Sequence, residues 1–80
     1  MELVIPVDSK VTWINKDDHT HTVTSGHDTG YGLYEFVQDG VFNSGNLEQG
    51  ESFTFHFTKP GRFDHFCVPH PWMSGAIVVE

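Results

Sequence analysis

Apolar and polar residues alternate along two stretches of this chain. The stretch "KVTWIN" (residues 10–15) alternates, with Val11 and Trp13 on one side and Lys10 and Thr12 on the other, and "ESFTFHFT" (residues 51–58) is the cleaner case. In the second stretch Phe53, Phe55 and Phe57 share one face, while threonine and histidine occupy the other. An alternation with period two is typical of a β-strand that is buried on one side. Both stretches therefore predict strands with one apolar face.

Turn residues separate these stretches from further strand-like ones. "KPG" (59–61) is a turn signal, and "RFDHFC" (62–67) follows it, so residues 51–67 predict a β-hairpin. "GAIVVE" (75–80) predicts a closing strand, and "TVTSG" (22–26) predicts a short strand that ends at Gly26. Many short strands between turns indicate an all-β fold, either a sandwich or a barrel.

Residues 26–40 interrupt the alternation. Their glycines and acids predict a long loop, with a helical turn around residues 33–37. A chain of 80 residues is enough for one domain, so we expect residues 1–80 to form a single domain. By default we assign the larger aromatic residues of the strands to its core: Trp13, Phe42, Phe53, Phe55, Phe57 and Phe63.

The formal net charge is −7, which makes nucleic acid an unsuitable partner. An acidic surface favours a cationic partner, or serves only to keep the protein in solution. No apolar run approaches the ~20 residues that a membrane span needs. No charged-then-apolar leader precedes residues 2–7, so we expect a mature protein or a domain without its targeting segment.

The stretch "CVPHPWM" (67–73) carries the candidate chemistry. Cys67, His70 and Met73 offer a thiolate, an imidazole and a thioether at intervals of three residues. Cys67 is the only cysteine, so it has no partner for an internal disulfide. This donor set suits copper, whereas structural zinc sites are built from cysteine and histidine. The plainer alternatives are a buried thiol, a turn histidine and a core methionine.

A blue-copper site requires a second histidine from elsewhere in the chain. His21 is the best candidate because it follows a predicted strand and a polar turn. His19 falls on the same face of an extended "HTH", where it lines the metal, binds a further ion or is simply solvated. We expect His27 and His56 to be exposed. His65 is either a core histidine or a neighbour of the site.

Two segments together resemble a known family. "VTWINKDDHTHTV" (11–23), followed by "GRFDHFCVPHPWMSGAIVVE" (61–80), is similar to the blue (type 1) copper cupredoxins, especially the amicyanin, plastocyanin and small archaeal members. The resemblance implies a cupredoxin-like Greek-key β-sandwich of about seven or eight strands. Carried over position by position, it implies one copper ion per chain, held by these residues: His21, Cys67, His70 and Met73.

The same resemblance implies a function. Members of the family carry one electron at a time, as the copper cycles between Cu(I) and Cu(II), and are not enzymes. The implied partner is a redox protein that docks at the surface around His70 and Trp72. The implied location is outside the cytoplasm, in the periplasm or facing outward at the cell membrane. We further expect Thr22, through its N–H or its hydroxyl, to support the cysteine side of the site.

The sequence departs from the family pattern at His19, Thr20 and His65, which replace residues that ordinarily shield the metal. This favours an alternative function, a copper protein with an accessible site that binds or turns over a small molecule such as nitric oxide or nitrite. A third possibility is copper delivery without redox turnover. Phe66, beside Cys67, is either a second electron route or an ordinary exposed aromatic residue. A cysteine hydrolase is a poor fit because no acidic partner stands at a recognisable spacing.

Overall fold

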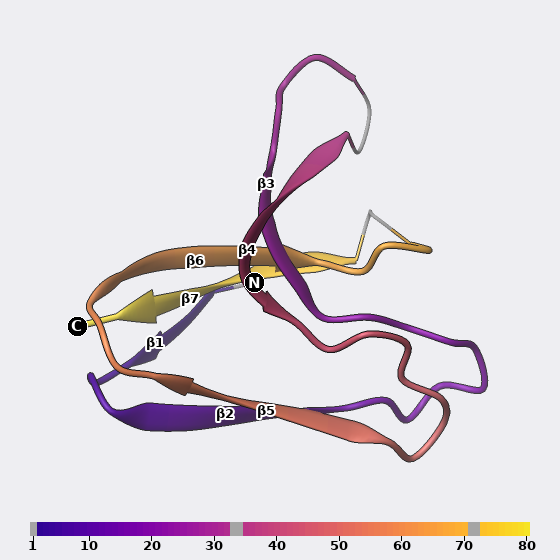
Figure 1. Cartoon of the computed structure of the whole chain (residues 1–80), viewed down its shortest axis with the longest axis horizontal. Helices are drawn as coiled ribbons and strands as arrows, with labels where there is room; N and C mark the ends of the chain where they lie inside the picture. Colours follow the sequence, from indigo (N-terminus) through magenta and orange to yellow (C-terminus); the bar gives the residue numbers. More distant parts are fainter. Residues whose placement is uncertain (1, 33–34, 71–72) are drawn as a thin grey trace.

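The structure is a computed structural model that describes residues 2–32, 35–70 and 73–80, and these residues form seven β-strands (Figure 1). The strands are β1 (Glu2–Ile5), β2 (Ser9–Ile14), β3 (Thr24–Asp28), β4 (Phe36–Asn43), β5 (Ser52–Phe57), β6 (Gly61–Phe66) and β7 (Ser74–Val79). The described part of the chain contains no helix of the length and apolar character that a membrane span requires.

The strands form two sheets that face each other. One sheet has five strands in the order β1-β7-β6-β3-β4, and the other pairs β2 with β5. The β1–β7 pair is parallel, and every other pair is antiparallel. The predicted all-β sandwich is therefore confirmed, with seven strands in the described residues.

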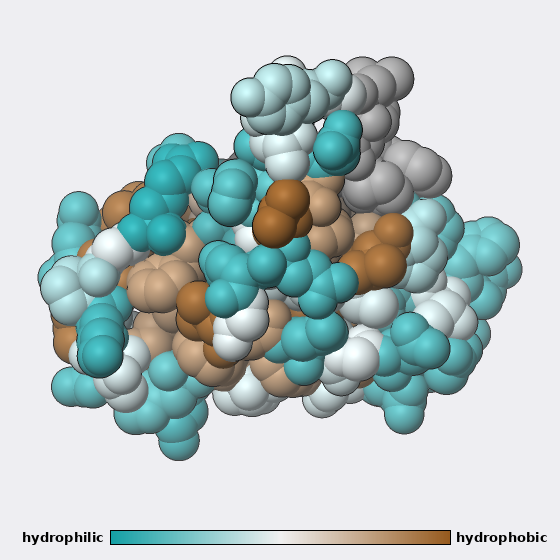
Figure 2. Space-filling model, turned by 45° about the horizontal axis from the view of Figure 1, so that its top comes forward, coloured by the Kyte–Doolittle hydropathy of each residue, from teal (hydrophilic) through white to brown (hydrophobic). Residues whose placement is uncertain are grey.

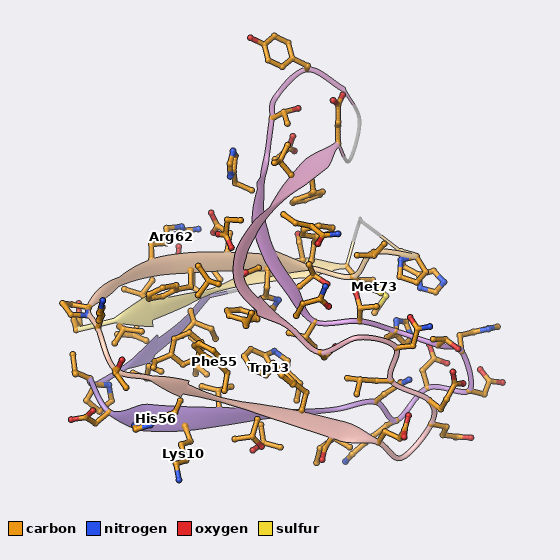
Figure 3. All side chains as sticks on the ribbon, viewed as in Figure 1. Lys10, Trp13, Phe55, His56, Arg62 and Met73 are labelled. Carbon is orange, nitrogen blue, oxygen red and sulfur yellow. The ribbon has the colours of Figure 1, made fainter. Side chains whose placement is uncertain are left out.

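The alternation in β2 and β5 determines which side chains point inward. Lys10 pairs with His56, and Trp13 pairs with Phe53, so residues of like character share a face. Figure 3 shows Trp13 and Phe55 directed between the sheets, whereas Lys10 and His56 point away. The small sheet thus has a polar face toward the solvent and an aromatic face that packs in the core.

An aromatic cluster fills the space between the sheets. Phe57 is 1% exposed, and its ring lies 5.9 Å from that of Phe42, which in turn lies 5.7 Å from Trp13. The six aromatic residues assigned to the core all belong to this cluster or pack against it, as predicted. Together with aliphatic side chains, these rings form the core, whose buried members are Val23, Phe42, Leu47, Phe57, Ile77 and Val79.

The predicted hairpin at residues 51–67 is wrong. β5 pairs with β2, whereas β6 pairs with β7 and β3, so the turn at 59–61 carries the chain from one sheet to the other. The physical reason is that both strands bury their apolar faces in the same core. Because β5 and β6 belong to different sheets, the rings of Phe57 and Phe63 face each other across the sandwich, with their centroids 5.3 Å apart.

The predicted loop at residues 26–40 is also largely wrong, because β3 runs beyond Gly26 and β4 begins at Phe36. The two strands form a hairpin that projects from the sandwich (Figure 1). Gly26 permits this pairing, since a Cβ atom there would lie 2.2 Å from the carbonyl oxygen of Val37. The predicted helical turn at 33–37 falls partly outside the described residues, and Val37 belongs to β4.

Apolar side chains also reach the surface of the molecule. Figure 2 shows them on one face as separate patches among hydrophilic residues. Scattered exposure of this kind is normal for small proteins, so surface hydropathy alone does not locate a partner. Among the described residues, the exposed large apolar ones are Leu3, Val4, Ile14, Tyr31, Val37, Val41, Val68 and Met73.

Candidate metal centre

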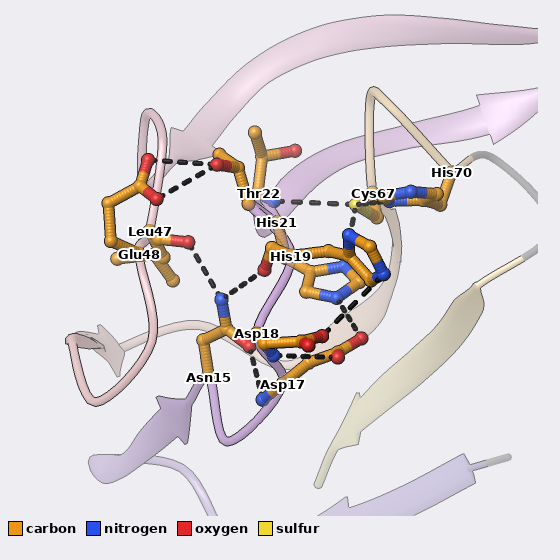
Figure 4. Close-up of polar contacts among 11 residues, drawn as sticks. Asn15, Asp17, Asp18, His19, His21, Thr22, Leu47, Glu48, Cys67 and His70 are labelled. Atoms are coloured by element: carbon orange, nitrogen blue, oxygen red, sulfur yellow. Dashed lines mark hydrogen bonds and ion pairs between the residues drawn. The ribbon is translucent and has the colours of Figure 1, made fainter.

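Three of the four predicted ligand residues meet at one end of the sandwich. The donor atoms of His21, Cys67 and His70 all lie within 4.8 Å of one another. The Nδ1 atom of His21 is 3.4 Å from the sulfur of Cys67, and the Nδ1 atom of His70 is 3.7 Å from it (Figure 4). Cys67 is only 4% exposed. Residues 46 positions apart are thus brought together around one buried sulfur.

A compact turn shapes the segment that carries Cys67 and His70. The amide of Cys67 donates to the carbonyl of Met73 at 3.1 Å, and the amide of Met73 donates to the carbonyl of His70 at 2.8 Å. The amide of His70 also donates to the carbonyl of Cys67, at 3.1 Å. These bonds fix the shape of the loop between β6 and β7. The sulfur of Cys67 and the ring of His70 therefore lie close together.

Met73, the fourth predicted ligand residue, lies beside the cluster. It lines a cavity of about 270 Å³ together with His21 and Cys67, and its side chain is half exposed. Met73 therefore lines the same cavity as His21 and Cys67.

The backbone of His21 is anchored to a distant segment. His21 and Leu47 form an isolated antiparallel bridge, in which each amide donates to the other residue's carbonyl, at 3.0 and 2.7 Å. Leu47 itself is buried in the core. Because of this bridge, His21 keeps a fixed position although it lies outside the regular strands.

A carboxylate that sequence reasoning missed holds the ring of His21. The Nε2 atom of His21 lies 2.8 Å from Oδ2 of Asp17. The hydrogen bond with His21, followed by one with Asp18, lowers the pKa of Asp17 to about 2. An ionised carboxylate only accepts, so Nε2 is the nitrogen that carries a proton, and in the neutral ring Nδ1 is then the nitrogen that presents a lone pair toward Cys67. The available signal was an acid four residues before a candidate ligand histidine.

Thr22 contacts the cysteine loop through both of its polar groups. Its amide donates to the sulfur of Cys67 at 3.4 Å. Its hydroxyl accepts a hydrogen bond from the amide of Val68 at 2.8 Å and lies 3.0 Å from the hydroxyl of Thr24. The sequence suggested the N–H or the hydroxyl of Thr22 for this contact, and both groups contact the cysteine loop.

The remaining histidines do not belong to the cluster of His21, Cys67 and His70. His19 is exposed, and its ring lies 6.4 Å from the ring of His70. His65 is half-buried with its ring edge-on to Trp13 at 5.5 Å, and burial lowers the pKa of His65. His27 and His56 are exposed, as expected.

Phe66 is not an exposed aromatic residue. It is 5% exposed, and its ring stacks on that of Phe36 at 4.7 Å. The projecting hairpin supplies this cover, because Phe36 opens β4. Trp72, the other aromatic residue considered near the cluster, lies outside the described residues.

The donor set fits copper. One thiolate and two imidazoles converge, a thioether adjoins them, and this mixture of soft and borderline donors suits both oxidation states of copper. A structural zinc site would close a tetrahedron with further cysteine or histidine. The donor that adjoins this cluster is instead a thioether, which is not among the usual ligands of zinc.

Comparisons with known proteins agree with this chemistry. Residues 1–80 match the model of a protein family described as copper binding proteins, plastocyanin/azurin family. The chain is 34% identical to amicyanin of Paracoccus denitrificans over 79 residues, and 33% identical to amicyanin-alpha of Methylorubrum extorquens over 79 residues. These alignments cover 99% of the chain but only 55% and 60% of the two relatives. The chain thus spans little more than half of their length.

Solved structures show the same likeness. A purple cupredoxin from Nitrosopumilus maritimus superimposes with a TM-score of 0.82 at 33% identity, covering 99% of this chain and 77% of that one. The reduced Cu(I) form of an amicyanin mutant superimposes with a TM-score of 0.72 at 31% identity, covering 99% and 69%. The fold is therefore shared with these proteins.

Proposed function

Because the chain belongs to the plastocyanin/azurin family of copper-binding proteins, we propose that it carries single electrons between redox partners through a type 1 copper site. The observation that supports this function most strongly is the convergence of His21, Cys67 and His70 around one buried sulfur. In this proposal residues 1–80 act as one cupredoxin domain and as an electron carrier rather than an enzyme.

The residues that would hold the ion are His21 and His70 through Nδ1, Cys67 through its thiolate, and Met73 as a weaker ligand through its thioether. Copper, when bound, supplies the reversible exchange of one electron. The chain's contribution is to keep its donors in place. The backbone bridge to Leu47 and the carboxylate of Asp17 fix His21, and the hydrogen-bonded turn fixes the other donors. Little rearrangement between oxidation states favours fast transfer.

The proposed partner is a redox protein that docks around His70 and Trp72. His70 is partly exposed at the end of the sandwich, so its ring gives a short path from the metal to the surface. The net charge of −7 favours a partner with a cationic face. The resemblance to the family supports export to the periplasm or to the outward face of the cell membrane.

Voltammetry of the copper-loaded protein tests the electron-carrier function. We expect one copper ion per chain and a reversible one-electron wave that persists over repeated cycles. Loss of the ion on each reduction would instead favour copper delivery.

A specific observation favours the second candidate function, in which a small molecule such as nitric oxide or nitrite reaches the metal. The cavity of about 270 Å³ beside His21, Cys67 and Met73 is lined mainly by apolar side chains. Titrating nitrite, nitric oxide or azide into the copper-loaded protein while recording the visible spectrum separates the two functions. An unperturbed spectrum supports the pure carrier.

Replacing Met73 with glutamine should change the colour and lower the reduction potential while copper remains bound. An amide oxygen is a harder donor than a thioether and stabilises Cu(II) relative to Cu(I). The measurement is voltammetry together with the visible spectrum. Val68→Gln is the matched control, because Val68 is similarly exposed on the same loop but offers no sulfur. Equal shifts in the two variants would exclude Met73 as a ligand.

Replacing Thr22 with valine should shift the reduction potential by about 20–40 mV, which corresponds to about 0.5–1 kcal/mol for one electron. Valine keeps the amide that donates to Cys67 but removes the hydroxyl that accepts from Val68, so the cysteine loop loses a tether. Thr12→Val is the control, since the Thr12 hydroxyl bonds only to that of exposed Thr54. A potential that moves no more than in this control would contradict the role of the hydroxyl.

A further inference from the structure

Asn15 uses every hydrogen-bonding group of its side chain. Its Nδ2 atom donates to the carbonyl of His19 at 2.9 Å and to the carbonyl of Leu47 at 2.8 Å. Its Oδ1 atom accepts from the amide of Asp17 at 2.9 Å. Asn15 is 7% exposed, so these bonds are largely shielded from water. One buried amide therefore connects three backbone positions.

The backbone of Asn15 is itself firmly anchored. Its amide donates to the carbonyl of Glu51 at 3.0 Å, and its carbonyl accepts from the amide of Gly50 at 2.7 Å. Asn15 directly follows β2, and Glu51 directly precedes β5, so the residue sits at the end of the small sheet. The side chain thus extends from a rigid base.

The three bonds lead to His21 by two routes. The first passes through the loop, because Asn15 holds Asp17 N and His19 O, and the carboxylate of Asp17 contacts the ring of His21. The second passes through Leu47, whose carbonyl accepts from both Asn15 Nδ2 and the amide of His21. Figure 4 shows these contacts converging around Asn15.

We propose that Asn15 is a positioning residue of the metal centre, which fixes the ring of His21 by shaping the loop that presents Asp17 to it. The inference rests on the proposed function only in taking His21 as a ligand. The position requires a planar group with two donors and one acceptor, which asparagine supplies at this length. Aspartate would lose both donors and set an oxygen against two carbonyls, and alanine would lose all three bonds.

Nuclear magnetic resonance of the metal-free protein tests the proposal without copper. In the wild type we expect a slowly exchanging Nε2 proton on His21 and protected Nδ2 protons on Asn15. In Asn15→Ala and Asn15→Asp the His21 proton should exchange at least about tenfold faster, since its acceptor is no longer held. Rapid exchange of both Asn15 Nδ2 protons in the wild type would overturn the proposal, even if neither variant folds.

Copper affinity supplies a second readout. Partners that orient a ligand typically change metal affinity about 10–100-fold, so we expect Asn15→Ala to bind Cu(II) at least about tenfold more weakly and with an altered thiolate absorption band. Ser25→Ala is the matched control, because fully buried Ser25 bonds to the backbone of Phe42 in the sheet. It should lose stability yet keep wild-type affinity and exchange at His21.

The outcomes separate the two proposals. If Asn15→Ala loses stability like Ser25→Ala but retains slow exchange at His21 and near-wild-type affinity, Asn15 is merely structural and the inference fails. If wild-type protein binds copper without thiolate absorption, the proposed function fails instead. The exchange measurement on metal-free protein still decides the role of Asn15 in that case.

Discussion

Cys67→Ser is expected to abolish the intense visible absorption of the copper-loaded protein. That absorption arises from charge transfer between a thiolate and Cu(II), and Cys67 is the only thiol in the sequence. The serine hydroxyl is a hard donor that stays protonated near neutral pH, so it does not replace the covalent sulfur bond. Serine is similar in size to cysteine, and the fold should survive. The measurement is the visible spectrum at a fixed copper-to-protein ratio.

The control for this variant is His56→Asn. His56 is an exposed histidine on β5, directed away from the core (Figure 3), and its change should leave the spectrum intact. Unfolding curves of the metal-free proteins establish that both variants are folded. If copper-loaded Cys67→Ser retained the band, the thiolate assignment would be wrong.

Phe57→Ala is expected to destabilise the metal-free protein by about 3–5 kcal/mol, the usual loss for a buried phenylalanine. Phe57 is the largest fully buried side chain, and its ring lies 4.9 Å from that of Phe55 and 5.3 Å from that of Phe63. It therefore joins the two sheets at the end of β5, where the chain passes from one sheet to the other. Small domains have only about 5–15 kcal/mol of stability in total, so the loss is severe.

Urea unfolding monitored by tryptophan fluorescence measures this effect. Tyr31→Ala is the control, because Tyr31 is 92% exposed and removing its ring should change the stability by no more than about 0.5 kcal/mol. A loss below about 1 kcal/mol in Phe57→Ala would mean that the core does not depend on this contact between the sheets.

The strands β2 and β5 could be predicted from their alternation, but the pairing of the strands could not, and β4 lay in a segment that predicted a loop. Alternation shows which face of a strand is apolar, and it correctly identified the inner faces of β2 and β5. It carries no information on which strand lies alongside. The "KPG" turn is compatible with a hairpin and with a connection between two sheets. In the structure it connects the two sheets, because β5 pairs with β2 and β6 pairs with β7.

The loop residues of the candidate site could be predicted because their spacing is specific. Cys67, His70 and Met73 form a recognisable set, and the resemblance to the family supplied His21. Asp17 and Asn15 could not be assigned, since a loop rich in polar residues looks the same whether it supports a ligand or faces only water. Phe66 was misjudged because its cover, Phe36, comes from a segment that the sequence indicated to be a loop.

The visible and electron paramagnetic resonance spectra of the copper-loaded wild-type protein test the central claim most directly. We predict one copper ion per chain, an intense thiolate band, and the narrow hyperfine splitting of a Cu(II) ion bonded covalently to sulfur. A protein that binds one copper ion but remains colourless, with the broad splitting of a site built from nitrogen and oxygen, would contradict the account.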